Sequence, residues 1–175
     1  ARRVRRGGQN LEGEPGDRAA ITYAELQRRV ARAANGLTAL GIEPGDRVVV
    51  YLPVLVETVV IALACARIGA VHSLVFGGFS AEAGRFRLED TGAKLLVTTD
   101  GQNRRGTRVE VKSAADAAAQ ELPNLEHVLV VRRTGNDIPW NPDRDIWMEE
   151  ELARASADCP PEPMGAEDPL FILYT

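Results

Sequence analysis

The sequence predicts an α/β fold, with alternating strand–helix units that form a mostly parallel sheet covered by helices on both faces. Short apolar runs rich in β-branched residues alternate along the chain with stretches whose apolar residues recur at helical spacing. Three of these runs, RVVVYL, KLLVTT and LFILYT, are apolar almost throughout, which is typical of strands buried on both faces of a sheet. Strands and helices in this order form parallel sheets with right-handed crossovers.

The first regular element is predicted to be a helix that begins after Thr22 and ends at Gly41. Thr22 and Glu25 have the T-x-x-E spacing of a capping box. Five apolar residues then follow at helical spacing: Leu26, Val30, Ala33, Leu37 and Leu40. Glycine is a common residue just beyond a helix, because it adopts the left-handed conformation without strain.

The rest of the chain repeats a strand-then-helix pattern. Five strands are predicted from apolar, β-branched runs, at residues 47–52, 70–76, 93–100, 126–133 and 170–175. Four further helices are predicted between them, at residues 57–69, 80–92, 113–122 and 145–155. The irregular stretches at residues 133–145 and 156–168 are interpreted as surface connections within one domain.

Composition excludes some classes of function. The chain has 175 residues, 45% of them hydrophobic and 26% charged, which is usual for one globular domain. A net charge of −4 and an aromatic content of 5% argue against a nucleic-acid partner. No apolar run reaches the roughly 20 residues of a membrane span. The two cysteines, Cys65 and Cys159, form no disulfide framework, which is typical of a reducing compartment. The sequence therefore predicts a cytoplasmic protein, and no membrane partner is expected.

The N-terminal residues are expected to lie outside the fold. The first ten residues, ARRVRRGGQN, contain four arginines and no apolar face that could be buried. We therefore expect residues 1–11 to be disordered or a foreign leader. A basic arm that contacts phosphates is the alternative interpretation.

Two loops predicted at the carboxyl ends of strands have features suited to an anionic ligand. The FGGFS loop contains two glycines that allow close approach, and Ser80 with the following helix amides could hold an anion. The DGQNRRGTR loop carries Arg104, Arg105 and Arg108, whose guanidinium groups match phosphate oxygens. A tight turn and a solvated basic loop are the alternatives. Together the loops predict a phosphate-rich ligand at one end of the sheet.

The other reactive residues build no recognisable catalytic or metal site. His72 and His127 fall in predicted strands, where they are interpreted as core or edge residues. Cys159 has no neighbour suited to nucleophilic or metal chemistry. No serine stands in a G-x-S-x-G setting, and no G-x-G-x-x-G follows a strand, which disfavours a dinucleotide-dependent oxidoreductase. The residues alone therefore predict a binding site but no reaction.

Several segments resemble the AMP-forming acetyl-coenzyme A synthetase family, which belongs to the adenylate-forming superfamily with the luciferases and the adenylation domains. These segments run in order from about Glu12 to Thr175: ITYAEL, ANGLTALGIEPGDRVVVYLP, RIGAVHSLVFGGFS, LEDTGAKLLVTTDG and EDPLFILYT. The resemblance implies that residues 12–175 are part of the large N-terminal AMP-binding domain. It also implies that the chain stops just before the loop that holds the ATP phosphates.

The resemblance implies an acetate–coenzyme A ligase that uses ATP, coenzyme A and Mg²⁺ and forms acetyl-coenzyme A, AMP and diphosphate through an acetyl-adenylate. A propionate-specific ligase and a non-catalytic interaction module are the alternatives. No catalytic residue is expected in this segment, so the isolated chain is expected to be inactive. The full enzyme is expected to be a monomer or small homo-oligomer whose partners are small molecules and not nucleic acid.

The resemblance further implies that the two loops form part of the coenzyme A nucleotide site. Phe76, Gly77 and Gly78 match the aromatic ring and backbone that lie against the adenine. Arg104 matches an arginine that meets the 3′-phosphoadenosine end, and Val109 matches an apolar neighbour of the adenine.

The sequence departs from the family pattern at Thr107, where an arginine or lysine is usual. This departure leaves one phosphate contact open. Arg105 or Arg108 could replace the missing cation, but only if the loop bends differently from the family's.

Overall fold

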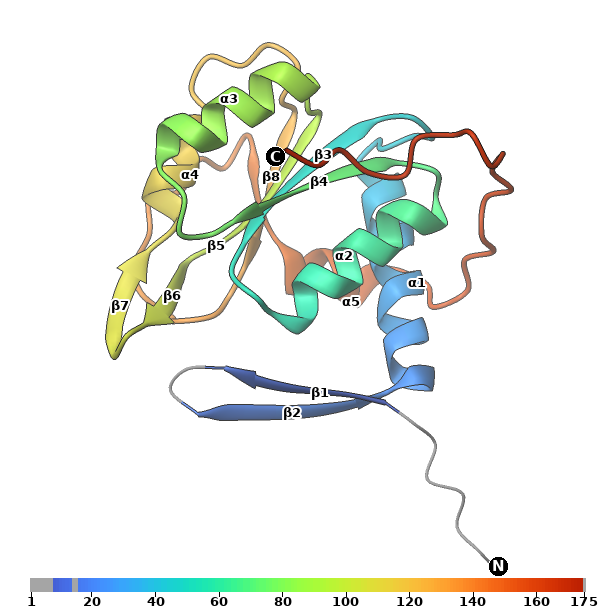
Figure 1. Cartoon of the computed structure of the whole chain (residues 1–175), viewed down its shortest axis with the longest axis horizontal. Helices are drawn as coiled ribbons and strands as arrows, with labels where there is room; N and C mark the ends of the chain where they lie inside the picture. The colour runs from blue at the N-terminus through green and yellow to red at the C-terminus, as the bar shows by residue number, and fades with distance from the viewer. Residues whose placement is uncertain (1–7, 14–15, 175) are drawn as a thin grey trace, which may run out of the picture.

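A five-stranded parallel sheet forms the centre of the computed structural model, which describes residues 8–13 and 16–174 (Figure 1). Its strands, in spatial order, are β4 (Val71–Phe76), β3 (Arg47–Leu52), β5 (Leu95–Thr99), β8 (His127–Val131) and β9 (Asp145–Trp147). Strand β3 pairs with both β4 and β5, so Val50 lies between Leu74 and Val97. The carboxyl ends of β4 and β5 therefore lie at the same end of the sheet. The predicted fold class is confirmed.

Helices cover both faces of the sheet (Figure 1). On one face lie α1 (Tyr23–Ala39), α2 (Val56–Arg67) and α5 (Met148–Arg154), and on the other lie α3 (Ala81–Thr91) and α4 (Lys112–Ala118). Strand residues alternate between the two cores, since Val48 and Val50 pack on the first face and Val49 and Tyr51 on the second. No helix among the described residues is long and apolar enough to cross a membrane.

The predicted helix ends are confirmed where a capping residue marks them. Thr22 Oγ1 accepts a hydrogen bond from the Glu25 backbone N–H at 3.2 Å. Ser80 caps α3 in the same way, accepting from the Ala83 N–H at 3.2 Å. Gly92 ends α3 in the left-handed conformation, with φ of 58°. These short-range contacts explain why α1 and α3 have the boundaries expected from the sequence.

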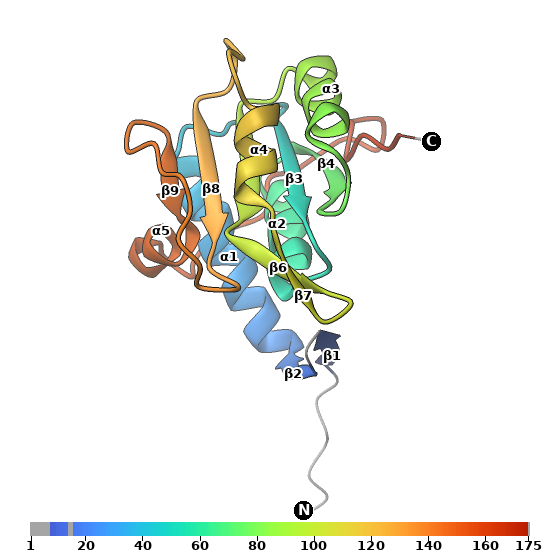
Figure 2. The ribbon, with the colours of Figure 1, turned by 90° about the vertical axis from the view of Figure 1, so that its left-hand side faces the viewer.

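The predictions for the arginine loop and for the start of the last helix were wrong. The predicted arginine loop is an antiparallel hairpin of β6 (Gly101–Arg104) and β7 (Thr107–Glu110) that projects beyond the end of the sheet (Figure 2). The predicted helix at residues 145–155 begins only at Met148, because residues 145–147 pair with β8 as strand β9. In both cases pairing with a neighbouring strand overrides the local pattern.

The region before α1 forms a hairpin that the sequence did not predict. Strand β1 (Gly8–Gly13) pairs antiparallel with β2 (Asp17–Thr22). Of the expected leader at residues 1–11, residues 1–7 lie outside the described residues, and residues 8–11 belong to β1.

The LFILYT run is not the buried strand that the sequence predicted. It makes one bridge to the edge strand β4, where the Ile172 N–H donates to the His72 carbonyl at 2.9 Å. Phe171 is 54% exposed and Leu173 is 71% exposed, because nothing in the described part of the chain covers them. Thr175 lies outside the described residues.

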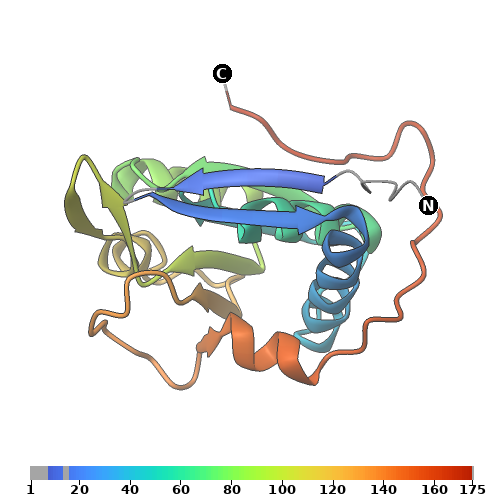
Figure 3. The ribbon, with the colours of Figure 1, turned by 90° about the horizontal axis from the view of Figure 1, so that it is seen from below.

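The segment between α5 and this run passes around the outside of α1 (Figure 3). The Asn35 side-chain amide donates to the Asp158 carbonyl at 2.8 Å, and Arg67 Nε donates to the Cys159 carbonyl at 2.6 Å. These bonds hold the segment against α1 and α2. The prediction of a surface connection between the last helix and the last apolar run is confirmed.

Candidate functional site

The two loops selected from the sequence lie next to each other at the carboxyl end of the sheet. The Gly77 carbonyl in the first loop accepts a hydrogen bond from Gln102 Nε2 in the hairpin, at 2.8 Å. The guanidinium carbon of Arg104 lies 5.8 Å from the centre of the Phe76 ring. A Cβ atom placed on Gly78 would lie 2.7 Å from Arg104 Nη1. The structure thus brings the glycines and Arg104 together, as the sequence predicted.

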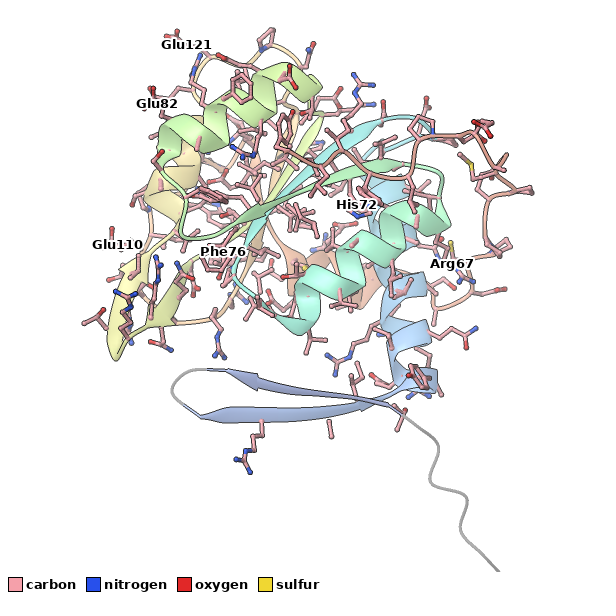
Figure 4. The ribbon with its side chains drawn as sticks, in the orientation of Figure 1. Arg67, His72, Phe76, Glu82, Glu110 and Glu121 are labelled. Carbon is pink, nitrogen blue, oxygen red and sulfur yellow. The ribbon has the colours of Figure 1, made fainter. Side chains whose placement is uncertain are left out.

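Residues 76–79, here called the glycine turn, connect the edge strand β4 to α3. Phe76 is the last residue of β4, and its ring meets the Phe79 ring edge to face, with centroids 6.5 Å apart. The Phe79 carbonyl accepts a hydrogen bond from the hydroxyl of Tyr51, which is buried in the second core. The turn is therefore tied to the sheet while Phe76 remains 46% exposed. Figure 4 shows Phe76 beside the β6–β7 hairpin.

The Ser80 hydroxyl accepts from the Ala83 N–H, as the first turn of α3 requires. Its oxygen is therefore engaged within the helix. Of the anion-binding features predicted for this loop, the glycine backbone is the part that faces Arg104.

The hairpin register decides which side chains share a face. Arg104 pairs with Thr107, and two residues further along the strands Gln102 pairs with Val109. Paired residues, and residues two apart on one strand, point to the same side of an antiparallel hairpin. One face of the hairpin therefore carries Gln102, Arg104, Thr107 and Val109. Gln102 and Arg104 contact the glycine turn from this face.

The alternative cations do not share that face. Arg108 pairs with Asn103 and so lies on the opposite side of the hairpin. Arg105 occupies the turn itself, with φ of 51°. The Thr107 hydroxyl donates to the Arg104 carbonyl at 2.9 Å and closes that turn. A substitute for the missing cation at position 107 would thus require a different hairpin geometry.

Asp100 holds the base of the hairpin. Its buried carboxylate accepts hydrogen bonds from three backbone N–H groups at 2.7–2.8 Å: those of Gly101, Arg133 and Gly135. Burial raises the pKa of Asp100, but the N–H groups of Thr134, Arg133, Gly135 and Gly101 together outweigh it, so the pKa lies below its usual value. This carboxylate joins the start of β6 to the loop after β8.

Lys112 lies at the same end of the hairpin as Asp100, in the first turn of α4 just after β7. Its side chain is fully buried, and Nζ lies 2.8 Å from Asp116 and 2.7 Å from Asp145. Arg144 also contacts both carboxylates, at 2.5 Å from Asp116 and 2.9 Å from Asp145. These four charged side chains connect the start of α4, at Lys112, to strand β9, at Asp145.

Sequence reasoning missed Asp100, Gln102 and Lys112. Asp100 had one available signal, because it directly follows a buried strand at the carboxyl end of the sheet. Gln102 and Lys112 had none, since their partners are set by the hairpin register and by a short strand that the sequence did not predict.

The histidines and cysteines lie away from this face. Burial raises the pKa of the Cys65 thiol to about 12 and lowers the pKa of His72. No group of three or more His, Cys, Asp or Glu side chains within the described ranges could hold a metal ion. A cavity of about 510 Å³ lies between α1, α2 and α5, lined by arginines, glutamates and Met148, and does not reach the glycine turn.

Comparison with known proteins relates the chain to one family. Residues 6–175 match the family described as AMP-binding enzyme. The chain is 56% identical over 166 residues to an acetyl-coenzyme A synthetase of Streptomyces avermitilis, covering 95% of this chain and 26% of that protein. It is 55% identical over 162 residues to an acetyl-coenzyme A synthetase of Halorhodospira halophila, covering 93% of this chain and 25% of that protein.

A solved structure has the same fold. The acetoacetyl-CoA synthetase from Streptomyces lividans superposes with a TM-score of 0.81 at 34% identity, covering 91% of this chain and 24% of that chain. The chain thus spans about a quarter of the length of the relatives that it matches.

Proposed function

The chain belongs to the AMP-binding enzyme family, and on that premise we propose that it is part of an AMP-forming acetate–coenzyme A ligase. The acetyl-coenzyme A synthetases at 56% and 55% identity support acetate as the acyl substrate. The free, buried cysteines Cys65 and Cys159 support the proposal of a cytoplasmic location, where thiols stay reduced.

The proposed reaction has two halves. A carboxylate oxygen of acetate attacks the α-phosphorus of ATP, the bond to the leaving diphosphate breaks, and an acetyl-adenylate forms. The coenzyme A thiolate then attacks the acetyl carbonyl carbon and displaces AMP. Mg²⁺ neutralises phosphate charge in reactions of this kind. We assign no residue of this chain to the metal, because no suitable cluster lies within the described residues.

We assign the hairpin and the glycine turn to the nucleotide end of coenzyme A. The observation that carries this assignment is the position of Arg104, whose guanidinium lies over the Phe76 ring and against Gly78. Its guanidinium would bind the 3′-phosphate, since arginine can donate two parallel hydrogen bonds to phosphate oxygens. The adenine would pack on Phe76 and on the backbone of Gly77 and Gly78, which carry no side chain to hold it away.

Val109 and Thr107 complete the proposed site. Val109 is 37% exposed on the same face of the hairpin as Arg104 and would give the adenine an apolar neighbour. Thr107 also lies on this face but supplies no charge. Arg104 would therefore be the main cation for the 3′-phosphate in this part of the chain, with Arg108 turned away.

Arg104→Ala in the full-length enzyme tests the assignment. The substitution removes hydrogen bonds to a charged group, so we expect the KM for coenzyme A to rise about tenfold or more. The KM for ATP and the rate of acetate-dependent ATP–diphosphate exchange should change less than about twofold, because the contact is remote from the first half-reaction. Arg108→Ala is the matched control, as it removes the same charge from the opposite face. Equal effects on coenzyme A and ATP would overturn the assignment.

Coenzyme A without its 3′-phosphate gives a second, independent measurement. The wild-type enzyme should prefer coenzyme A over dephospho-coenzyme A, whereas Arg104→Ala should discriminate little between them. If the substitution weakens both ligands by the same factor, Arg104 does not contact the 3′-phosphate.

The acyl group of the substrate is tested separately. The structural relative at 34% identity is named for acetoacetate, and a propionate ligase is the other alternative within the family. Comparing kcat/KM for acetate, propionate and acetoacetate decides among them, and we expect acetate to give the highest value.

A non-catalytic interaction module is the alternative from a different class of function, and the exposed apolar residues Leu74, Phe171 and Leu173 near the sheet edge favour it. Full-length protein without ATP–diphosphate exchange activity would support that alternative. Size-exclusion chromatography of the full enzyme tests our expectation of a monomer or small homo-oligomer.

A further inference from the structure

We propose that Gln102 is a positioning residue that sets the gap between the glycine turn and the β6–β7 hairpin, and that it thereby tunes coenzyme A binding. The inference deepens the proposed function and rests on it. Gln102 would act through Gly77 and Arg104, without itself meeting the reacting atoms.

Gln102 joins two loops that lie 25 residues apart in the chain. Its side chain is only 4% exposed, and its Nε2 donates to the Gly77 carbonyl at 2.8 Å. A buried carbonyl that loses its donor cannot recover the bond from water without moving. The hydrogen bond therefore holds the glycine turn at one distance from β6.

Gly77 is held equally firmly from the other side. Its N–H donates to the Leu52 carbonyl at the end of β3, at 3.0 Å. A Cβ atom at Gly77 would lie only 2.9 Å from the Pro53 backbone nitrogen, so the turn already lies against the chain that follows β3. The turn cannot move in that direction, so losing the Gln102 hydrogen bond would leave the distance between the turn and the hairpin without this restraint.

The same strand carries the proposed phosphate ligand. Arg104 lies two residues after Gln102 on the same face of β6, and its guanidinium reaches the Phe76 ring and Gly78. One end of β6 thus fixes the glycine turn, and the other end places the cation beside it. The space left for a purine between the glycine turn and the hairpin depends on the Gln102 contact and on the Arg104 contact. Gln102 therefore helps to set the size of this space without lying in it.

The central test is Gln102→Met in the full-length enzyme. Methionine fills a similar volume but cannot donate to the Gly77 carbonyl. We expect the KM for coenzyme A to rise about tenfold, which is the loss of one hydrogen bond to a buried acceptor. Acetate-dependent ATP–diphosphate exchange should stay within about twofold of wild type, because the first half-reaction does not use this gap. Asn103→Met, one residue away on the opposite face, is the matched control and should leave both quantities unchanged.

Gln102→Glu supplies a readout that a purely structural role would not move. A protonated carboxyl group can donate to the Gly77 carbonyl, whereas a carboxylate repels it, and burial near a carbonyl raises a carboxyl pKa. The KM of this variant for coenzyme A should therefore approach the wild-type value as the pH is lowered from about 8 to about 5.5. The ratio of KM values between Gln102→Met and wild type should stay constant over the same range.

The outcomes separate the inference from the proposed function. If wild-type enzyme uses coenzyme A normally and Gln102→Met leaves its KM unchanged, the inference is wrong and the proposed function stands. Equal losses in both half-reactions would make Gln102 a residue of general stability and also overturn the inference. If the wild-type enzyme does not use coenzyme A, the proposed function fails, and the inference fails with it. Should Gln102→Met not fold, the pH series of Gln102→Glu decides by itself, and a KM ratio to wild type that is independent of pH would contradict us.

Discussion

Gly78 and Arg104 are packed so closely that a methyl group at position 78 would lie 2.7 Å from Nη1 of the arginine. The same methyl group would lie 2.8 Å from Cε1 of Phe76. Both atoms belong to the ends of exposed side chains, which can move aside. At Gly77, by contrast, a methyl group would meet backbone atoms, 2.9 Å from the Pro53 nitrogen and 3.1 Å from the Leu52 carbonyl carbon. The two neighbouring glycines are therefore required for different reasons.

Alanine substitutions should separate these reasons. We expect Gly78→Ala to raise the KM for coenzyme A several-fold, because it displaces Arg104 and Phe76, while changing the free energy of unfolding by less than about 1 kcal/mol. Gly77→Ala should lower the free energy of unfolding by about 1–3 kcal/mol, because the backbone must shift to admit the methyl group. Urea unfolding and coenzyme A kinetics measure both quantities. The opposite ranking in either measurement would contradict the assigned roles.

A cation restored at position 107 should strengthen binding of coenzyme A. Thr107 lies on the Arg104 face of the hairpin, so Thr107→Arg would direct a second guanidinium toward the proposed 3′-phosphate. We expect the KM for coenzyme A to fall about threefold at low salt, with a smaller effect at high salt, because exposed charges are screened.

The control for this prediction is an arginine that already lies nearby. Arg108→Ala should change the KM for coenzyme A by less than about twofold, since Arg108 lies on the opposite face. If Arg108→Ala matches the effect of Arg104→Ala, the hairpin in the bound enzyme must differ from the one described here.

The fold was predictable because its strongest determinants are local. The β-branched runs, the helical spacing of apolar residues and the caps at Thr22, Ser80 and Gly92 each act within a few residues. The LFILYT run has an equally clear strand pattern but only one bridge. A buried strand needs a paired neighbour and side chains that cover its faces, and the sequence of the strand alone does not say whether they are present.

The proximity of the glycine turn and Arg104 could be predicted from the order of the strands. Because β4 and β5 both pair parallel with β3, the segments that follow them lie at the same end of the sheet. The glycines after β4 therefore lie close to Arg104. The hairpin itself was not predicted, since β6 and β7 are polar and their turn places Arg105 in the left-handed conformation, where glycine is usual. Without that register, the contact from Gln102 to Gly77 could not be anticipated.

The Asp100 carboxylate should contribute stability that depends on pH. Its pKa in the folded protein lies below the usual value, so it favours the folded state above the unfolded pKa of about 4. This contribution is lost as the pH falls below about 4 and through the folded pKa. Asp100→Asn places an amide among four N–H donors, and we expect it to lower the free energy of unfolding at pH 7 by about 2–4 kcal/mol.

Urea unfolding of both proteins between pH 7 and about pH 3 tests this account. The difference in unfolding free energy between wild type and Asp100→Asn should be constant near neutral pH and should shrink in the acid range. Asp137→Asn is an exposed control on the loop that Asp100 holds, and we expect it to change stability by less than about 0.5 kcal/mol. A difference that does not change down to pH 3 would mean that Asp100 acts by packing and not by charge.

The buried Lys112 should matter far more for stability than a lysine at the surface. Its ammonium is fully enclosed with the Asp145 carboxylate 2.7 Å away, so Lys112→Met leaves that buried charge with Arg144 as its remaining cation. We expect a loss of about 3–5 kcal/mol in the free energy of unfolding. Lys94 pairs with Asp46 at 3.3 Å but is partly exposed, and Lys94→Met should lower the free energy of unfolding much less than Lys112→Met does.

A double substitution shows whether charge or volume causes this loss. Burial raises the pKa of Asp145, but the Asn141 N–H and the Lys112 and Arg144 side chains together outweigh it, so the pKa lies below its usual value and the carboxylate is ionised at neutral pH. If the unpaired charge is the cause, adding Asp145→Asn to Lys112→Met should recover part of the lost stability, and the double-mutant cycle should give a coupling energy of more than about 1 kcal/mol. If the two losses instead add, the lysine stabilises the base of the hairpin through its packed hydrocarbon chain, and the ion pair contributes nothing that methionine cannot replace.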